Sequence, residues 1–318
     1  MIDILILGYS DLVQRRIIPS LESIGRCQSI EIASNSKIPD KSGKISKLYS
    51  NYIEALESFN GDVVYISLHN SIHDFYIIET IKRGLNCIVD KPAILNPKSI
   101  DIINDLINEN NCILAESVVY NYHIAWNSLI QDLGGSEKIF HIDSNFRVPE
   151  LDNDNFRMNP KLGGGADNDM SSYSISLGRH LWKRKPENIT ISNLNFYKKL
   201  VKGFNISVDY GDNKSLNGSY GFGYNYENKI LMHSEIGRCG YERVFSPPPD
   251  FEVKIKGIIN NESYEKKGFK DDTFKNFFQN FFDSLEKDSS MIWLEDIIDS
   301  FNDLQMLKEA IDDERRSK

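Results

Sequence analysis

The alternation of short apolar runs with helix-like segments in the first third of the chain constrains the fold more than any other feature. Strand-length apolar runs occupy Ile2–Leu7, Ser29–Ser34, Val63–Leu68 and Cys87–Val89. Between the last two, His73–Arg83 places its large apolar side chains on one side of a helix. Strands that alternate with helices form parallel βαβ units. The sequence therefore predicts an α/β domain with a doubly wound parallel sheet.

The pattern changes after about Tyr120, and strands then follow one another through short turns. Ile189–Ile258 alternates strand-like stretches with the turn signals Gly211–Asn213 and Leu216–Gly218. This pattern predicts an α+β domain with a largely antiparallel, open sheet. The predicted domains are 1–120 and 121–318. Helices are expected in the second domain near Ile124–Leu133, Asp169–Leu181, Phe274–Leu285 and Trp293–Ala310.

The composition excludes several classes of protein. The chain of 318 residues is 40% hydrophobic and carries a formal net charge of −9, which disfavours binding to nucleic acid or anionic membranes. Its four cysteines are far apart and form no CxxC pair, so neither a disulfide framework nor a zinc site is expected. The opening MIDILILGYSD has no basic segment and turns polar after one strand, which predicts a cytoplasmic protein.

The turn after the first strand is a candidate dinucleotide-binding site. It reads Gly8-Tyr9-Ser10-Asp11-Leu12, and only the first glycine of a GxGxxG fingerprint is present. Gly8 permits a tight turn that directs helix amides at a pyrophosphate, and Ser10 is small enough for close approach. An ordinary strand–helix turn is the alternative interpretation.

The second predicted strand ends without the acidic residue that usually selects NAD. Ser34, Asn35 and Lys37 occupy this position and offer donors and one positive charge. These groups suit the 2′-phosphate of NADP, so NADP is the predicted cofactor and NAD the second choice. Lys37 taken alone is equally consistent with a solvated loop.

Two segments carry candidate catalytic residues. Lys91, in Asp90-Lys91-Pro92, follows the fourth predicted strand, and ligands of open parallel sheets bind beyond such strand ends. Asp169 and Tyr173 are four residues apart and share one face of the predicted helix after Gly163–Gly165. A tyrosine near a lysine ammonium is a plausible general acid. A half-buried packing tyrosine is the alternative.

His69 and His73 have the spacing of metal ligands on a helix. No carboxylate or cysteine cluster accompanies them, so no metal is predicted and this segment is expected to line the cofactor cleft. The residues expected around the cofactor in this region are Ser67, Leu68, His69, Asn70, His73, Asp90 and Lys91.

Taken together and in order, these segments resemble the glucose–fructose oxidoreductase and inositol dehydrogenase family, Gfo/Idh/MocA. The family's VYIALPNxxH, EKP, EAxMYRFHPQ, LGGGALxDxGxY and ERAFTPP patterns appear here as Val64–His73, Asp90–Pro92, Glu116–His123, Leu162–Tyr173 and Glu242–Pro249. Within the family, the opening Gly8–Pro19 is most similar to NADP-dependent nucleotide-sugar 3-ketoreductases. Departures include Asn35 for arginine, Asp90 for glutamate and His69 for proline.

The resemblance implies a Rossmann domain, a substrate domain whose open sheet often forms an oligomer interface, and hydride transfer between nicotinamide and a sugar carbonyl or alcohol. It implies that Tyr173 donates the proton, that Lys91 binds the same oxygen, and that Asp169 orients the substrate or the lysine. His123 and Arg157 are expected to join Asp169 and Tyr173 at the substrate. A homodimer or homotetramer is expected.

Three functions remain open on the sequence. The first is a nucleotide-sugar ketoreductase of surface-glycan or deoxysugar synthesis, which a basic pocket in the second domain would favour. The second is a dehydrogenase of a free sugar, polyol or dihydrodiol, and the third is a non-catalytic dinucleotide-binding protein. Retention of Lys91 and Tyr173 argues against the third, because a binding module needs neither. The candidate basic residues are Arg157, Lys161, Arg238 and Arg243.

Overall fold

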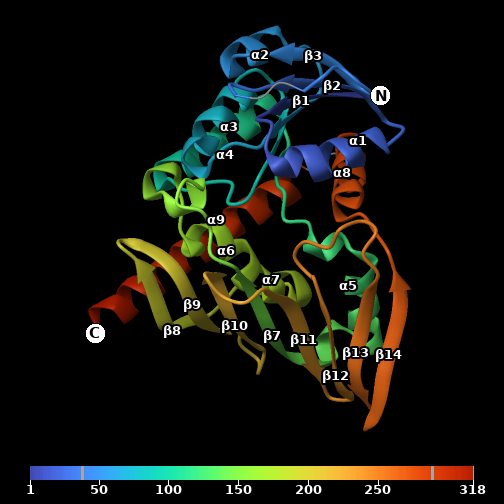
Figure 1. The fold of residues 1–318 in the computed structure, drawn as a ribbon, viewed down its shortest axis with the longest axis vertical. Helices are drawn as coiled ribbons and strands as arrows, with labels where there is room; N and C mark the ends of the chain where they lie inside the picture. The colour runs from blue at the N-terminus through green and yellow to red at the C-terminus, as the bar shows by residue number, and fades with distance from the viewer. Residues whose placement is uncertain (37–38, 288–289, 318) are drawn as a thin grey trace. The chain divides into compact units, whose positions relative to one another are not determined.

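The computed structural model describes residues 1–36, 39–287 and 290–317, which form two compact units (Figure 1). The first unit contains Met1–Val118 and Phe274–Phe301. The second contains Val119–Thr273 and the residues from Asn302 onward. Among the residues so described, no helix is long and apolar enough to cross a membrane.

A six-stranded parallel sheet forms the centre of the first unit, in the order β3-β2-β1-β4-β5-β6. Its strands are β1 (Ile2–Leu7), β2 (Cys27–Ala33), β3 (Ile45–Tyr49), β4 (Val63–Ile66), β5 (Asn86–Val89) and β6 (Leu114–Glu116). All residues of β4 are buried, as expected for a parallel strand covered on both faces. The doubly wound sheet predicted from the sequence is confirmed.

Helices cover both faces of this sheet. Val64 and Ile66 belong to a core with Ile77 and Ile81 of one helix, while Tyr65 contacts Phe278 on the other side, with ring centroids 5.8 Å apart. The helical segments are η1 (Val13–Ile17), α1 (Ile18–Glu22), α2 (Tyr52–Ser58), η2 (Asn70–Ile72), α3 (His73–Ile81), α4 (Pro97–Asn110), α8 (Thr273–Ser284) and the first part of α9 (Ser290–Arg316).

The structure differs from the predicted domain division at the C-terminal helices. The sequence division assigned all of 121–318 to the second domain, whereas Phe274–Phe301 packs with the first unit. The physical reason is a set of four fully buried rings on α8, followed by apolar residues of α9 in the core beside α3 and α4. The rings are those of Phe277, Phe278, Phe281 and Phe282.

An eight-stranded sheet dominates the second unit, in the order β14-β13-β12-β11-β7-β10-β9-β8. All neighbours are antiparallel except β7 and β10, so the predicted largely antiparallel sheet is confirmed. The strands are β7 (Ile139–Val148), β8 (Asn188–Tyr197), β9 (Leu200–Asp209), β10 (Ser215–Phe222), β11 (Glu227–Ser234), β12 (Gly237–Glu242), β13 (Val253–Ile259) and β14 (Glu262–Phe269).

Helices of the second unit gather on one face of this sheet (Figure 1). The helical segments of this unit are η3 (Tyr120–Tyr122), α5 (Ile124–Asp132), η4 (Ser136–Lys138), η5 (Phe156–Met158), η6 (Pro160–Leu162), α6 (Ala166–Ser174), α7 (Ser176–Trp182) and the part of α9 from Asn302 onward. Helix α6 packs on β7, β9 and β10, and α5 packs on β13. The predicted helix Asp169–Leu181 is interrupted at Ile175, where α6 ends.

One of the two predicted turns is correct and the other is wrong. Gly211–Asn213 joins β9 to β10 with positive φ at all three residues. Leu216–Gly218 lies inside β10, where Gly218 pairs with Ser144 of β7. A Cβ on Gly218 would stand 2.6 Å from the Ser144 carbonyl oxygen. Gly218 therefore allows β10 to approach β7 closely and does not form a turn.

Candidate active site

The turn after β1 is packed tightly against the end of β4. Gly8 has a φ of 103°, and its N–H donates to the Ala33 carbonyl at 2.8 Å. A Cβ at Gly8 would lie 2.1 Å from the Ser67 carbonyl oxygen, so the position requires glycine. Ser10 Oγ accepts a hydrogen bond from the Val13 N–H at 3.2 Å. Along the turn, Tyr9 and Leu12 are half-buried and Asp11 is exposed.

Hydroxyl groups from the carboxyl ends of β4 and β6 bind the carboxylate of Asp90, which follows β5. Tyr65 Oη and Ser117 Oγ donate to Asp90 Oδ1 at 2.6 and 3.2 Å, and Ser67 Oγ donates to Oδ2 at 2.7 Å. Ser10 Oγ lies 2.9 Å from Ser67 Oγ. The sequence predicted that Asp90 binds the cofactor. In the structure, both of its oxygens accept hydrogen bonds from hydroxyls of the protein.

Lys91 follows Asp90 directly and is half-buried. The segment after it is anchored, because the Ala93 N–H donates to the buried Glu116 carboxylate at 2.9 Å. The Pro92 carbonyl also lies 2.9 Å from His73 Nδ1. These contacts fix the backbone on which the lysine stands.

The two histidines after β4 have structural contacts. His73 is fully buried, with its second ring nitrogen 3.0 Å from the Leu68 carbonyl. Main-chain carbonyl oxygens thus lie within hydrogen-bond distance of both ring nitrogens. We therefore assign His73 to joining the segments at Leu68 and Pro92 and not to contact with the cofactor. His69 is half-buried, with Nδ1 3.0 Å from Ser71 Oγ, and burial lowers its pKa. Asn70 is buried beside them.

The tip of β2 presents small polar groups. Ser34 is buried, its Oγ accepts from the Ser36 N–H at 3.4 Å, and Asn35 is exposed. Lys37, predicted to bind a 2′-phosphate, lies outside the described residues. The carboxylate on the neighbouring part of β2, that of Glu31, accepts from Tyr49 Oη at 2.6 Å.

A packed glycine turn begins α6 in the second unit. The Gly165 N–H donates to the Arg157 carbonyl at 2.9 Å, and a Cβ at Gly164 would lie 2.5 Å from that oxygen. Asn168 Nδ2 donates to the Gly163 and Gly164 carbonyls at 3.2 and 3.1 Å. These contacts fix the direction in which α6 starts.

Asp169 and Arg157 form an ion pair. Arg157 Nε donates to Asp169 Oδ1 at 3.0 Å, and the Asp169 side chain is only 9% exposed. A buried carboxylate needs such a partner, because removal from water penalises its charge. The Arg157 guanidinium also lies over the Phe156 ring, 4.6 Å from its centroid. The sequence assigned Arg157 to the substrate, and in the structure its guanidinium pairs with Asp169.

Tyr173 lies one turn after Asp169 and is surrounded by aromatic rings. Its ring centroid is 4.7 Å from Phe245, 5.2 Å from Phe146 and 6.5 Å from Tyr120. We call these four residues the aromatic cluster. Sequence analysis missed the three neighbours, although Tyr120 and Phe245 fall inside motifs that it quoted. The cluster fixes the position of the Tyr173 ring.

A polar network adjoins the aromatic cluster. Tyr120 Oη lies 2.8 Å from Ser176 Oγ and 2.9 Å from His180 Nδ1. His123, predicted to bind substrate, begins α5, and its Nδ1 accepts from the Ala125 N–H at 3.1 Å. Its Nε2 is buried and has no hydrogen-bond partner within the part of the chain described. Burial lowers the pKa of His123.

The four basic candidates have different surroundings. Arg157 is paired with Asp169, and Lys161 is exposed in η6. Arg238 pairs with His233 at one end of β12, while Arg243 follows the other end and lies over the rings of Tyr226 and Phe251. These surroundings therefore do not decide between the nucleotide-sugar and free-sugar hypotheses.

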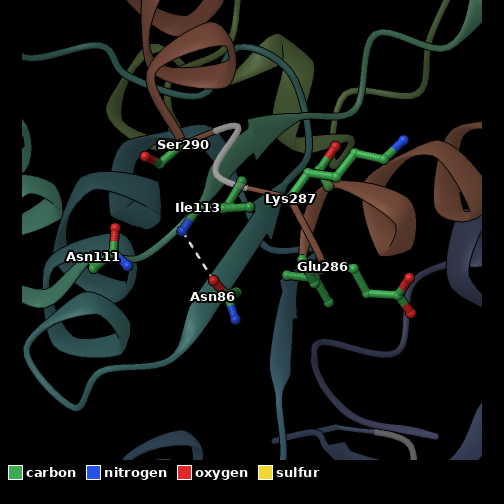
Figure 2. Close-up of a pocket in the computed structure, with 8 residues that line it drawn as sticks. Asn86, Asn111, Ile113, Glu286, Lys287 and Ser290 are labelled. Atoms are coloured by element: carbon green, nitrogen blue, oxygen red, sulfur yellow. Dashed lines mark hydrogen bonds between the residues drawn. The ribbon is translucent and has the colours of Figure 1, made fainter.

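A pocket of about 380 Å³ in the first unit lies where β5 and β6 begin, at the amino ends of these strands (Figure 2). Asn86 is the first residue of β5, and its Oδ1 accepts from the N–H of Ile113, just before β6. Asp90 and the hydroxyl groups that bind it lie at the opposite, carboxyl ends of the strands. This pocket is therefore separate from the candidate site.

The first unit has the architecture of a nicotinamide-dependent oxidoreductase, with the glycine turn and the lysine segment at the carboxyl edge of its sheet. Residues 2–118 match the model of an oxidoreductase family with an NAD-binding Rossmann fold, GFO_IDH_MocA. The resemblance inferred from the motifs is thus confirmed over residues 2–118, which fold as the Rossmann part of the first unit.

Several similar proteins are named as oxidoreductases of sugars. A dTDP-3,4-didehydro-2,6-dideoxy-α-D-glucose 3-reductase of Saccharopolyspora spinosa is 22% identical over 81% of each chain. A 3-ketoreductase of Actinomadura kijaniata, solved with NADP and TDP-benzene, has a TM-score of 0.84 at 19% identity over 96% of each chain. An aldose-aldose oxidoreductase of Caulobacter crescentus has the same TM-score at 14% identity, covering 100% of this chain and 98% of its own.

Proposed function

We propose that this protein is an NADPH-dependent ketoreductase that reduces a keto group on a nucleotide-linked sugar. Two residues carry the proposal. Lys91 stands on the segment after β5 that hydrogen bonds anchor, and Tyr173 of α6 is packed within the aromatic cluster. The relative from S. spinosa is named for reduction of a dTDP-linked ketosugar, and the match extends over 81% of each chain.

The dinucleotide site fits the residues present. Gly8 allows the turn to approach the end of β4, and Ser34 and Asn35 stand at the tip of β2 where an acidic side chain would select NAD. Ser34–Ser36 contains no carboxylate to repel a 2′-phosphate. We therefore expect NADPH to bind at least 10-fold more tightly than NADH, and fluorescence titration at fixed ionic strength measures this ratio. Equal affinities would contradict the cofactor assignment.

NADPH, when bound, supplies the hydride that reduces the carbonyl carbon. Tyr173 donates a proton from Oη to the developing alkoxide, and Lys91 stabilises the negative charge on the same oxygen. Asp169, held by Arg157, orients the substrate or the lysine. Aromatic packing keeps the Tyr173 ring in one place, which lowers the entropic cost of the proton transfer.

Ligand stabilisation tests the proposal directly. Thermal unfolding is followed with dTDP, with dTDP-glucose and with free glucose or xylose, each with and without NADP. We expect dTDP and dTDP-glucose to raise Tm further in the presence of NADP, because bound nucleotide stabilises the folded state. Stabilisation by free xylose alone would favour the alternative of a free-sugar dehydrogenase, as in the Haloferax volcanii relative named D-xylose 1-dehydrogenase (NADP(+)), which is 27% identical over 55% of this chain.

We further propose a homodimer or homotetramer built on the sheet face that turns away from α5, α6 and α7. Half-exposed polar side chains occupy the centre of this face. Among them, the Asp143 carboxylate lies 3.3 Å from His141 Nε2 and 2.8 Å from His233 Nε2. The C-terminal helices were expected to help cover this sheet, but α8 packs in the first unit. Sedimentation of a monomer at micromolar concentration would contradict this proposal.

A further inference from the structure

A chain of hydroxyl groups joins the turn after β1 to the carboxylate of Asp90. Val13 N–H donates to Ser10 Oγ at 3.2 Å, Ser10 Oγ lies 2.9 Å from Ser67 Oγ, and Ser67 Oγ lies 2.7 Å from Asp90 Oδ2. Ser67 is buried, and all four residues belong to the first unit. The chain thus crosses from the nucleotide turn to the residue that precedes Lys91.

The direction of each hydrogen bond in this chain follows from the chemistry of its last member. A carboxylate only accepts, so Ser67 gives its single hydroxyl proton to Asp90. Ser67 Oγ can then only accept from Ser10, which must donate its own proton to Ser67. Ser10 Oγ in turn accepts from Val13 N–H, and every donor in the chain points toward Asp90.

We propose that Asp90 is a positioning residue that, through Ser67 and Ser10, locks the turn after β1 in the conformation that receives the cofactor phosphates. The proposal rests on the proposed function only in taking that ligand to be a dinucleotide. Its first prediction concerns the cofactor-free protein. Loss of Ser67 Oγ separates the turn from its carboxylate, whereas the remaining hydrogen bonds of Asp90 stay in place.

Ser117, which is not part of this row of hydrogen bonds, provides a matched control. Its hydroxyl donates to the same carboxylate at 3.2 Å, but to Oδ1, where Tyr65 Oη also donates at 2.6 Å. Ser117 is buried like Ser67. Ser117→Ala therefore removes a hydroxyl from Asp90 without cutting the route to Ser10.

Hydrogen exchange of the cofactor-free protein is the first test. We expect Ser67→Ala to speed exchange of the Val13 amide about 10-fold, a typical consequence of losing one hydrogen bond to a charged group. Ser117→Ala should change it less than about twofold, and Ser67→Thr, which keeps the hydroxyl, should restore protection. Equal exchange in Ser67→Ala and wild type would overturn the proposal, as would equal acceleration by Ser117→Ala.

NADPH titration of the same variants is the second test. Ser67→Ala should weaken NADPH binding by about 10-fold, with Ser117→Ala within about twofold of wild type and Ser67→Thr close to it. Normal NADPH affinity in Ser67→Ala would overturn the role assigned to the chain. Failure of the wild type to bind NADPH would reject the proposed function instead, while the exchange measurement still decides whether Asp90 locks the turn.

Discussion

The two units support their functional side chains in different ways. In the first unit, Asp90 is held by hydroxyls that stand at the ends of parallel strands, and all partners are polar. In the second unit, Tyr173 is held by three aromatic rings and Asp169 by one arginine. On the proposed function, this difference is a division of work, in which the first unit holds the cofactor and the second positions the proposed proton donor.

Replacement of Tyr173, the proposed proton donor, should give the largest effect. Tyr173→Phe keeps the ring in the aromatic cluster and removes only the hydroxyl, so kcat should fall by roughly 10²–10⁴-fold with NADPH affinity nearly unchanged. Steady-state turnover with a dTDP-linked ketosugar and NADPH titration provide the two readouts. Near-normal turnover would mean that another group donates the proton, and would contradict the role proposed for the second unit.

A methyl group at the nucleotide turn should affect the first unit alone. In Gly8→Ala the new Cβ meets the Ser67 carbonyl and the residue keeps a positive φ, which together cost about 3 kcal/mol. We expect a lower Tm and NADPH binding weakened at least 10-fold. Gly84→Ala is the matched control, because Gly84 also has a positive φ but no atom within 4 Å of the added Cβ. Equal effects of both variants would show that backbone strain, not contact with β4, controls the turn.

Acid should weaken the second unit through His123. Burial lowers the pKa of this ring from its ordinary 6.5, so the unfolded chain takes up the proton first as the pH falls. Stability is therefore complete above about pH 6.5 and is lost below it, by at most ~1.4 kcal/mol per pH unit. His123→Asn keeps a good helix cap and does not titrate. Urea unfolding at pH 7 and 5.5 should show a smaller pH dependence in this variant, and an unchanged dependence would exclude His123 as its source.

The sequence predicted the first unit better than the second for a physical reason. Parallel strands carry their carboxyl ends to one edge, and the structure places Ser67 against Gly8 and Asp90 against Ser67 at this edge. The edge strand β3 and the helix α2 were not predicted, since the exposed and buried residues of Ile45–Tyr49 form only a weak pattern. The α8 rings were assigned to the wrong domain, because a buried face does not reveal which sheet it covers.

In the second unit, the helix spacing placed Asp169 and Tyr173 on one face, but their partners come from distant segments. Phe146 belongs to β7 and Phe245 follows β12, and only the folded sheet brings them to α6. Arg157 was predicted to bind substrate because its charge was visible in the sequence and its contact with Asp169 was not. Long-range pairing of this kind is set by register, which local patterns do not encode.

The most direct test of the central claim compares the turnover of Lys91→Ala, Tyr173→Phe and the double variant with one dTDP-linked ketosugar and NADPH. If the lysine of the first unit and the tyrosine of the second act on one oxygen, each single variant loses at least about 10²-fold in kcat, and the double variant is little worse than the poorer single one. Losses that multiply in the double variant would mean that the two residues act independently, and would contradict the coupled mechanism.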